Sequence, residues 1–349
     1  MHYNILTRNS LWAILMTTVC LSSCNNILSP GNAKESDASG EHGKPVPIIF
    51  DTDIGGDYDD VGALGMLHAL ADRGEVKILA TVASNLSPLV VPSISVINTY
   101  FGRPDLPIGA PKTQGVTQDS RELHWPDSLI AHYPYTYQST GEAPDAVEIY
   151  RKILSQQPDS SITIVSVGFL TNLMNLLLSE PDSFSPLNGQ DLVAKKVKSW
   201  VAMAGTFPEG KETNVMRDSS ASQYVIDNWP TPVVFSGFET GVEVFTGLRL
   251  IEEGPEDSPV RMAYAISIPK RAYDKDGRRS WDQTALLVAA RGFEPYYGYK
   301  TGQFITSPDG SNKWRDDPEG KHRHLVQKMS PDSVAYEIEN LMMHRPQKD

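Results

Sequence analysis

Hydrophobic positions along the chain follow two alternating patterns. Short runs rich in β-branched residues are typical of buried strands, and they occupy 46–50, 76–82, 162–167, 197–203 and 233–235. Between them, apolar residues recur at helical spacing in 59–70, 90–101, 146–154, 170–178, 219–228 and 283–291. Strands that alternate with helices favour a parallel sheet. The pattern therefore predicts an α/β fold with an open, mostly parallel sheet flanked by helices.

Two later segments depart from this alternation. Residues 114–143 are polar and aromatic with little periodicity, which predicts a long excursion over the site. Residues 304–326 contain the turn sequence Ser307-Pro308-Asp309-Gly310 between strand-like runs, which predicts a late hairpin. No linker composition interrupts 45–349, so this region is expected to be a single domain.

The N-terminal segment has the pattern of a targeting signal. Arg8 precedes an apolar run at 11–21, shorter than the roughly 20 residues of a spanning helix. The run ends in Leu21-Ser22-Ser23-Cys24, which resembles the bacterial lipoprotein box. The resemblance implies a signal peptide at 1–24 and a lipid on Cys24, with an ordinary secretory signal as the alternative.

Residues 25–44 are rich in Asn, Ser, Gly and charged residues, which predicts a flexible tether. With the lipid on Cys24 as the only membrane attachment, the expected location is the bacterial cell envelope, in the periplasm or at the outer membrane.

Charge and cysteine content exclude several classes of function. The formal net charge is −12, which argues against nucleic acid as a partner. Both cysteines, Cys20 and Cys24, lie in the N-terminal segment. The predicted domain therefore has no disulfide, zinc-thiolate site or cysteine nucleophile.

The most informative stretch follows the first predicted strand. Five aspartates fall between positions 51 and 60, with Gly55 and Gly56 among them, directly before a helical pattern. Carboxylates tolerate such crowding when they share a hard cation, and the glycines allow a sharp turn. Loops after the carboxyl ends of strands bind ligands in open α/β sheets. A solvated acidic turn is the alternative without function.

Three known motifs contain acidic residues in a similar arrangement, and this stretch fits one of them. A calcium-binding EF-hand loop needs Glu at its twelfth position, where Gly62 stands. Haloacid-dehalogenase-type phosphatases have Thr or Val where this chain has Gly55. Asp51-Thr-Asp53-Ile-Gly55, followed by Asp59-Asp60-Val-Gly-Ala63-Leu64, resembles the opening motif of the inosine-uridine nucleoside hydrolase family. The loop is longer by two residues and carries the additional Asp57.

Later strand ends resemble the same family in the same order. Asn85 follows the second strand, and Gly168-Phe-Leu-Thr171-Asn172 follows the third. Glu212-Thr-Asn214 comes later, but Phe207-Pro208-Glu209-Gly210 lacks the Asn that the family places against the ribose 5′ end. In Trp281-Asp282, Trp281 replaces the family's His that protonates the leaving base.

The resemblance implies a Rossmann-like nucleoside hydrolase fold and calcium-dependent hydrolysis of the N-glycosidic bond of a purine or pyrimidine ribonucleoside. It places Asp53, Asp60, Asp282 and the carbonyl of Thr171 around the Ca²⁺ ion. Asp53 is the expected general base, with Asp57 as the rival, and Asp51 is expected to orient its neighbours. The expected ribose contacts are Asp59, Asn85, Glu212 and Asn214, and Trp281 is expected to stack on the base.

Two alternatives remain open at this point. A lipid-anchored protein could bind a ribosyl ligand without cleaving it, and Trp281 in place of the acid is its best support. A metal-dependent phosphatase would use Asp51 as its nucleophile. If a histidine serves as the acid, the candidates are His124, His132, His322 and His324. The sequence leaves base preference and oligomeric state open, a homo-oligomer included.

Overall fold

The computed structural model describes residues 44–112, 114–119 and 122–346, which belong to one compact unit. The predicted signal peptide, Cys24 and all of the predicted tether except Lys44 lie outside these residues. Within the described part of the chain, no helix has both the length and the apolar character needed to cross a membrane.

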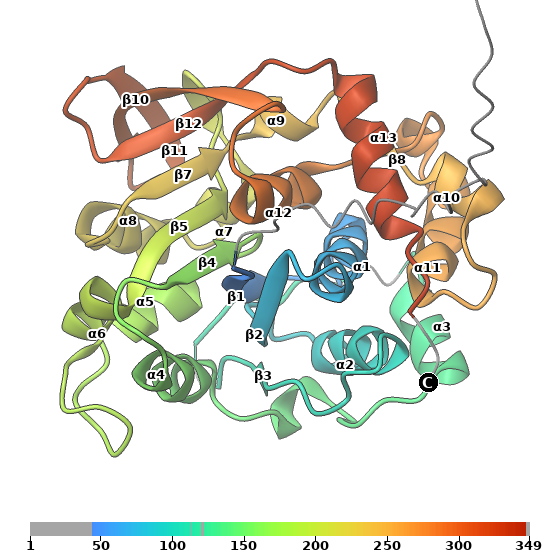
Figure 1. The fold of residues 1–349 in the computed structure, drawn as a ribbon, viewed down its shortest axis with the longest axis horizontal. Coiled ribbons are helices and arrows are strands. Elements are labelled where there is room, and N and C mark those ends of the chain that lie inside the picture. Colours follow the sequence, from blue (N-terminus) through green and yellow to red (C-terminus); the bar gives the residue numbers. More distant parts are fainter. Residues whose placement is uncertain (1–43, 113, 120–121, 347–349) are drawn as a thin grey trace, which may run out of the picture. The chain divides into compact units, whose positions relative to one another are not determined.

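The fold is built on a ten-stranded sheet with the order β3-β2-β1-β4-β5-β7-β12-β10-β11-β6 (Figure 1). The first seven strands in this order are parallel: β1 (Val46–Thr52), β2 (Val76–Ala83), β3 (Ile108–Gly109), β4 (Ile162–Ser166), β5 (Val197–Met203), β7 (Val233–Ser236) and β12 (His322–Gln327). All five predicted strands are present, which confirms the predicted α/β class.

An antiparallel extension completes the sheet on the side of β12. It consists of β10 (Tyr297–Thr306), β11 (Ser311–Asp316) and β6 (Glu209–Lys211). The turn at 307–310 joins β10 to β11, so the predicted late hairpin is confirmed. A separate two-stranded sheet pairs β8 (Phe245–Thr246) with β9 (Arg278–Arg279).

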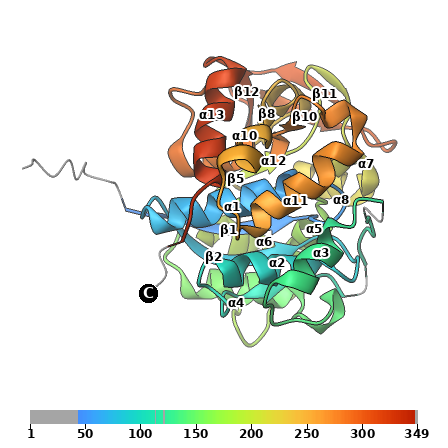
Figure 2. The ribbon, with the colours of Figure 1, turned by 90° about the vertical axis from the view of Figure 1, so that its right-hand side faces the viewer.

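Helices cover both faces of the sheet, and each face has its own hydrophobic core. Side chains alternate along a strand, so Ile48 and Phe50 of β1 belong to one core and Ile49 belongs to the other. The first core contains α1 (Asp59–Asp72), α2 (Val90–Tyr100), α3 (Trp125–His132), α10 (Leu248–Glu253), α11 (Pro259–Ser267), α12 (Trp281–Arg291) and α13 (Pro331–Met342). Figure 2 views the molecule from the side of α1, α2, α3 and α11.

The second core contains α4 (Ala146–Gln156), α5 (Thr171–Leu177), α6 (Gly189–Lys196) and α8 (Ser219–Asn228). Two shorter helices, α7 (Thr213–Arg217) and α9 (Phe238–Gly241), follow β6 and β7. All six predicted helices are therefore present.

The segment at 114–143 has more structure than its weak periodicity predicted. It contains α3, whose Trp125 and Leu129 are fully buried. It also returns to the sheet, because Val116 forms a β-bridge with Asn85 just beyond β2. This helix has eight residues and only three of them are buried, so its apolar pattern is too short to be recognised in the sequence.

Candidate active site

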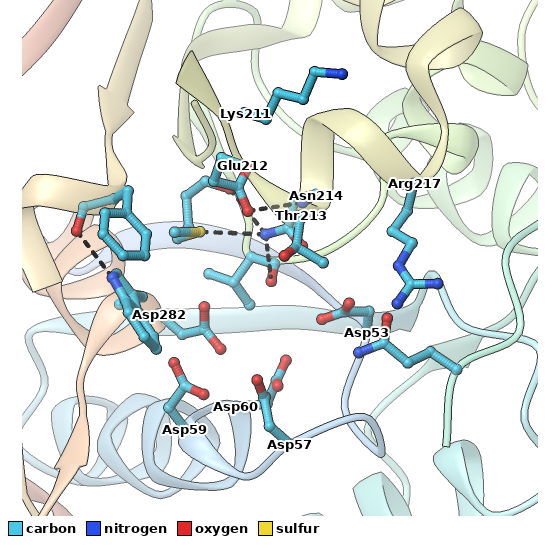
Figure 3. Close-up of a pocket in the computed structure, with 15 residues that line it drawn as sticks. Asp53, Asp57, Asp59, Asp60, Lys211, Glu212, Thr213, Asn214, Arg217 and Asp282 are labelled. Atoms are coloured by element: carbon cyan, nitrogen blue, oxygen red, sulfur yellow. Dashed lines mark hydrogen bonds between the residues drawn. The ribbon is translucent and has the colours of Figure 1, made fainter. Parts of the chain in front are cut away.

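A cavity of about 270 Å³ lies at the carboxyl ends of the central strands (Figure 3). Its lining consists of Asp53, Asp57, Asp59, Asp60, Gln118, Val167, Met203, Lys211, Glu212, Thr213, Asn214, Arg217, Phe238, Trp281 and Asp282. Six of these residues are acidic and two are basic. Segments far apart in the sequence meet here because parallel strands bring their carboxyl ends to one edge of the sheet.

The acidic loop brings its carboxylates to this cavity because β1 ends at Thr52 and α1 begins at Asp59. One oxygen from each of Asp57, Asp59 and Asp60 lies within 4.8 Å of the others. The Thr52 hydroxyl donates a hydrogen bond to Asp60 and holds that side chain toward the strand. Carboxylates in the first turn of α1 are also stabilised by the positive end of the helix dipole.

Asp53 and Asp282 belong to the same group of carboxylates. Figure 3 shows the side chains of Asp53, Asp59, Asp60 and Asp282 directed toward one space. Burial raises the pKa of Asp53, Asp60 and Asp282 well above the usual value, and repulsion from the neighbouring aspartates adds to it. A set of crowded oxygen ligands is what a hard divalent cation prefers, and its charge would remove the repulsion. The residues present therefore fit a cation of this kind.

Arg278 is a buried basic side chain that pairs with two of these aspartates, and the sequence analysis did not identify it. Its Nη2 atom lies 2.5 Å from a carboxylate oxygen of Asp57 and 2.5 Å from one of Asp59. Burial alone would lower the pKa of Arg278, but these carboxylates raise it, so the guanidinium stays charged. Its β9 position lies far from the acidic loop in sequence, and no local motif marks it.

Arg278 also makes the pKa of Asp57 differ from the pKa values of the neighbouring aspartates. Burial would raise the pKa of Asp57, but the Arg278 charge and its hydrogen bond outweigh this effect and hold the pKa below the usual value. Asp57, whose side chain is 41% exposed, is therefore a weaker proton acceptor than Asp53.

Asp51 lies outside the cavity, in the interior between β1 and the helices of the second core. Its Oδ2 atom accepts hydrogen bonds from the Tyr150 hydroxyl at 2.8 Å and from Asn172 Nδ2 at 3.1 Å. Burial raises the pKa of Asp51 to about 7. The same Asn172 amide donates to the carbonyl of Ala83 at the end of β2. Asp51 thus joins β1, β2 and α5 and agrees with an orienting role.

Glu212 and Asn214 reach the cavity through the start of α7. Glu212 caps the helix: its carboxylate accepts from the backbone N–H of Asn214 at 2.7 Å and of Gly205 at 3.1 Å. Burial raises the pKa of Glu212 to about 7. The Asn214 amide donates to the carbonyls of Met203 and Val167, at 3.1 and 3.3 Å. Both side chains are thus fixed against the ends of β4 and β5.

Thr171, whose carbonyl is a predicted metal ligand, is not among the residues that line the cavity. It is the first residue of α5, and its hydroxyl donates to Asp218 at 2.5 Å. The residue of this segment that lines the cavity is Val167. The sequence motif located the segment correctly but placed the cavity residue four positions too late.

Gly168 explains how this segment comes so close to Asp53. A Cβ atom at position 168 would lie 2.5 Å from the backbone nitrogen of Asp53 and 2.5 Å from the hydroxyl oxygen of Ser84. Only glycine allows backbones to approach this closely. The loops after β1, β2 and β4 therefore meet at this residue.

Asn85 does not line the cavity either, contrary to its predicted ribose contact. Its amide nitrogen donates to the carbonyls of Asp53 at 3.0 Å and of Gln118 at 2.6 Å. Its amide oxygen accepts from the backbone N–H of Ser87 and of Gln118, each at 3.0 Å. Asn85 therefore fastens the acidic loop to the 114–143 segment, which places Gln118 at the cavity.

We expect Asn85→Ala to lower the free energy of unfolding by about 1–3 kcal/mol, because buried backbone groups of Asp53 and Gln118 would lose their partners. Denaturant unfolding measures this change. Asn228→Ala is the matched control, since Asn228 is exposed and donates only to the nearby carbonyl of Tyr224. A loss at position 85 no larger than that at position 228 would contradict the structural role.

Aromatic side chains form the wall beside Asp282. The indole N–H of Trp281 donates to the carbonyl of Phe238 at 2.9 Å, and the two rings lie 5.4 Å apart. None of the four candidate histidines lines the cavity. His324 stacks on Phe207 with ring centroids 4.4 Å apart, and His322 accepts from the backbone N–H of Phe304. His124 and His132 are exposed.

The chain is similar to curated ribonucleoside hydrolases. The pyrimidine-specific ribonucleoside hydrolase RihA of Salmonella paratyphi B is 29% identical over 202 residues, which are 56% of this chain and 60% of that protein. RihA of Salmonella dublin is 28% identical over 201 residues, with the same coverage. The chain thus spans about 60% of the length of these curated relatives.

Solved structures share the fold. The purine-preferring ribonucleoside hydrolase from Gardnerella vaginalis has a TM-score of 0.67 at 15% identity, covering 85% of this chain and 98% of that one. The type III effector XopQ, solved in complex with adenosine diphosphate ribose, has a TM-score of 0.66 at 14% identity, with 87% and 95% covered. The plant nucleoside hydrolase PpNRh1 has a TM-score of 0.62 at 19% identity, with 86% and 98% covered.

The family model for inosine-uridine preferring nucleoside hydrolases matches residues 48–316, a range that contains every residue of the cavity. The chain belongs to the inosine-uridine preferring nucleoside hydrolase family.

Proposed function

We propose that this protein hydrolyses the N-glycosidic bond of a ribonucleoside and uses a bound Ca²⁺ ion to do so. The observation that carries the proposal is the convergence of Asp53, Asp60 and Asp282 on one space, opposite Glu212 and Asn214. The first group provides ligands for a hard cation, and the second provides an acceptor and an amide for the hydroxyls of a sugar.

The residues that would hold the cation are Asp53, Asp60 and Asp282, together with the carbonyl of Val167 in place of the predicted Thr171 carbonyl. A backbone carbonyl adds an oxygen ligand without adding charge. When bound, a divalent cation lowers the pKa of a coordinated water and orients that water and the sugar hydroxyls.

Asp53 is the general base in this proposal. Its carboxylate lines the cavity and forms no ion pair with any described residue, so it can accept a proton from water, whereas Asp57 is bound to Arg278, which lowers the pKa of Asp57. Asp53 takes a proton from water as the oxygen attacks C1′, and the transition state at the sugar resembles an oxocarbenium ion. Glu212 and Asn214 fix the ribose, and the wall of Trp281 and Phe238 offers a surface for the base to stack on. No lining residue is a histidine, so this mechanism has no imidazole acid for the leaving base.

The proposed substrate class comes from the family. Its members differ in base preference: RihA is described as pyrimidine-specific, and the Gardnerella enzyme as purine-preferring. We therefore propose a purine or pyrimidine ribonucleoside. The rival phosphatase mechanism loses its nucleophile, because Asp51 is fully buried and hydrogen-bonded outside the cavity.

The test measures free ribose released from inosine, uridine and adenosine by the purified protein. Chelation with EDTA should abolish release, and added CaCl₂ should restore it, with an equal concentration of MgCl₂ as the comparison. Restoration by Mg²⁺ alone would contradict the choice of calcium. Tight binding of inosine or uridine with no ribose release would instead support the non-catalytic ribosyl-binding protein.

A further inference from the structure

We propose that the preferred substrate carries a phosphoryl group on the 5′ carbon of its ribose, and that Arg217 and Lys211 bind this group. The inference rests on the proposed N-glycosidic hydrolysis and narrows its substrate class from a free nucleoside to a 5′-phosphorylated ribosyl compound.

Charge is distributed unevenly around the cavity. Asp53, Asp57, Asp59, Asp60 and Asp282 line the side of β1, α1 and α12, while the two lining cations, Lys211 and Arg217, lie on the side of β6 and α7. Figure 3 shows Arg217 on the opposite side of the cavity from Asp282. A phosphate would be repelled from the acidic side, so the field of the cavity itself allows an anionic substrate to bind in only one direction.

Arg217 has the features of an anion-binding side chain. It is exposed at the end of α7, and Figure 3 shows its guanidinium directed into the cavity. Among the residues that the structure describes, no carboxylate forms an ion pair with it. The planar guanidinium can bind a phosphate through two parallel hydrogen bonds.

Lys211 can add a second contact. Its Nζ atom lies 2.9 Å from a carboxylate oxygen of Asp309, and the two side chains are 48% and 60% exposed. Exposed pairs of this kind contribute little stability, so exchanging Asp309 for a phosphate would cost little. Thr213, which lies between these cations in sequence, is also an exposed lining residue.

Residues 211–214 alternate between side chains proposed to bind the ribose and side chains available to the phosphoryl group. Glu212 and Asn214 are buried in the floor, where they are proposed to bind the ribose, whereas Lys211 and Thr213 are exposed. The base would stack on Trp281, next to Asp282, at the opposite end from Arg217. In a nucleoside, C1′ carries the base and C4′ carries the 5′ carbon, one on each side of the ring oxygen. With the base on the aromatic wall, a 5′ substituent would extend away from that wall and toward the cations.

The neighbouring loop takes no part in the cavity lining. Phe207, Pro208, Glu209 and Gly210 are not among the lining residues, and none of them has an amide side chain. Phe207 packs among Phe235, Phe304, Trp314 and His324, and is not part of the cavity lining. Recognition of the 5′ end in this chain therefore depends on the charged residues of β6 and α7.

The phosphoryl group would bind without reacting. The oxygen of water forms a bond to C1′ as the bond between C1′ and the base nitrogen breaks. One water proton goes to Asp53, and the leaving nitrogen finally gains one proton from solvent, so the products are the free base and ribose 5-phosphate. A nucleoside 5′-monophosphate and a 5′-diphosphate-linked ribosyl compound share the recognised group.

The experiment compares kcat/KM for uracil release from uridine, UMP and UDP-glucose, using the full chain with Ca²⁺. We expect UMP to exceed uridine by tenfold or more. A higher value for UDP-glucose than for UMP would identify the diphosphate-linked source. We expect Arg217→Ala to lower the UMP-to-uridine ratio by about 10- to 100-fold, the usual effect of losing hydrogen bonds to a charged group. Lys211→Ala should lower it less.

Arg315→Ala is the matched control, since Arg315 is exposed on β11 and bonds to Gln303 outside the cavity. It should leave the ratio unchanged, and unfolding midpoints should show that every variant is folded. Turnover of uridine with none for UMP or UDP-glucose would overturn this inference and leave the proposed hydrolysis standing. The same is true of a ratio unmoved by Arg217→Ala. Failure to release uracil from any of the three would overturn both.

Discussion

Asp53→Asn should reduce kcat for ribose release by about 10²- to 10⁴-fold, the usual contribution of a general base. Asparagine keeps the size of the side chain but accepts no proton at neutral pH. Asp53 lines the cavity and forms no ion pair with any residue that the structure describes, which leaves its carboxylate available for this role. Asp57→Asn should cost much less, because Arg278 already lowers the pKa of Asp57.

Asp53 is also a proposed metal ligand, so the measurement must separate the two roles. Calcium affinity from calorimetric titration, recorded beside kcat at saturating Ca²⁺, does so: a base removes turnover even when the metal is bound. Asp227→Asn is the control, since Asp227 is exposed on α8. Equal losses in Asp53→Asn and Asp57→Asn would contradict the assignment of the base, and a wild-type rate in Asp53→Asn would reject it outright.

Arg278→Met should lower the free energy of unfolding of the metal-free protein by about 3–5 kcal/mol, the typical result of removing one partner from a buried ion pair. The Arg278 side chain is 5% exposed and lies against Asp57, Asp59 and Asp274. Methionine keeps a similar apolar stem but has no guanidinium. The variant therefore loses both the positive charge among the aspartates and the guanidinium's position over the rings of Tyr58 and Trp281.

The same variant should recover stability when Ca²⁺ is added, because the ion supplies charge that the arginine no longer provides. Denaturant unfolding with EDTA and with CaCl₂ measures both effects. Arg279→Met is a close control, because Arg279 is the next residue of β9 but lies over Phe245 and donates only a long hydrogen bond to Tyr273. If Arg278→Met is no less stable than Arg279→Met under either condition, the arginine is not a counter-charge of the acidic group.

Much of the fold could be predicted because local pattern and tertiary structure agree. Strands buried on both faces, such as Ile162–Ser166, are rich in β-branched residues. Amphipathic α4 has a clear helical period. The helices α11 and α13 were not predicted, although each begins with a serine cap followed by proline. Both helices lie outside the alternation of strands and helices from which the other helices were predicted.

The site residues also fall into those that local sequence could predict and those that it could not. Asp53, Asp59, Asp60, Glu212, Asn214 and Asp282 could be located because each follows a predicted strand or opens a helix, where sequence position determines location. Arg278 could not be located, because a two-residue strand far along the chain carries it to the acidic loop. Asn85 and Thr171 were found at the right strand ends, but the direction in which a side chain points after a strand is decided by tertiary hydrogen bonds.

The close contact at Gly168 has a consequence for engineering this protein. Because Gly168 lies directly against the backbone nitrogen of Asp53, the distance between the Asp53 loop and the Val167 carbonyl is a property of the main chain. Substituting rim residues such as Lys211 or Phe238 would reshape the entrance while leaving that spacing intact. Substrate choice and the bond-breaking centre are therefore separable modules, and a library confined to the rim could explore new ribosyl compounds without retuning the chemistry.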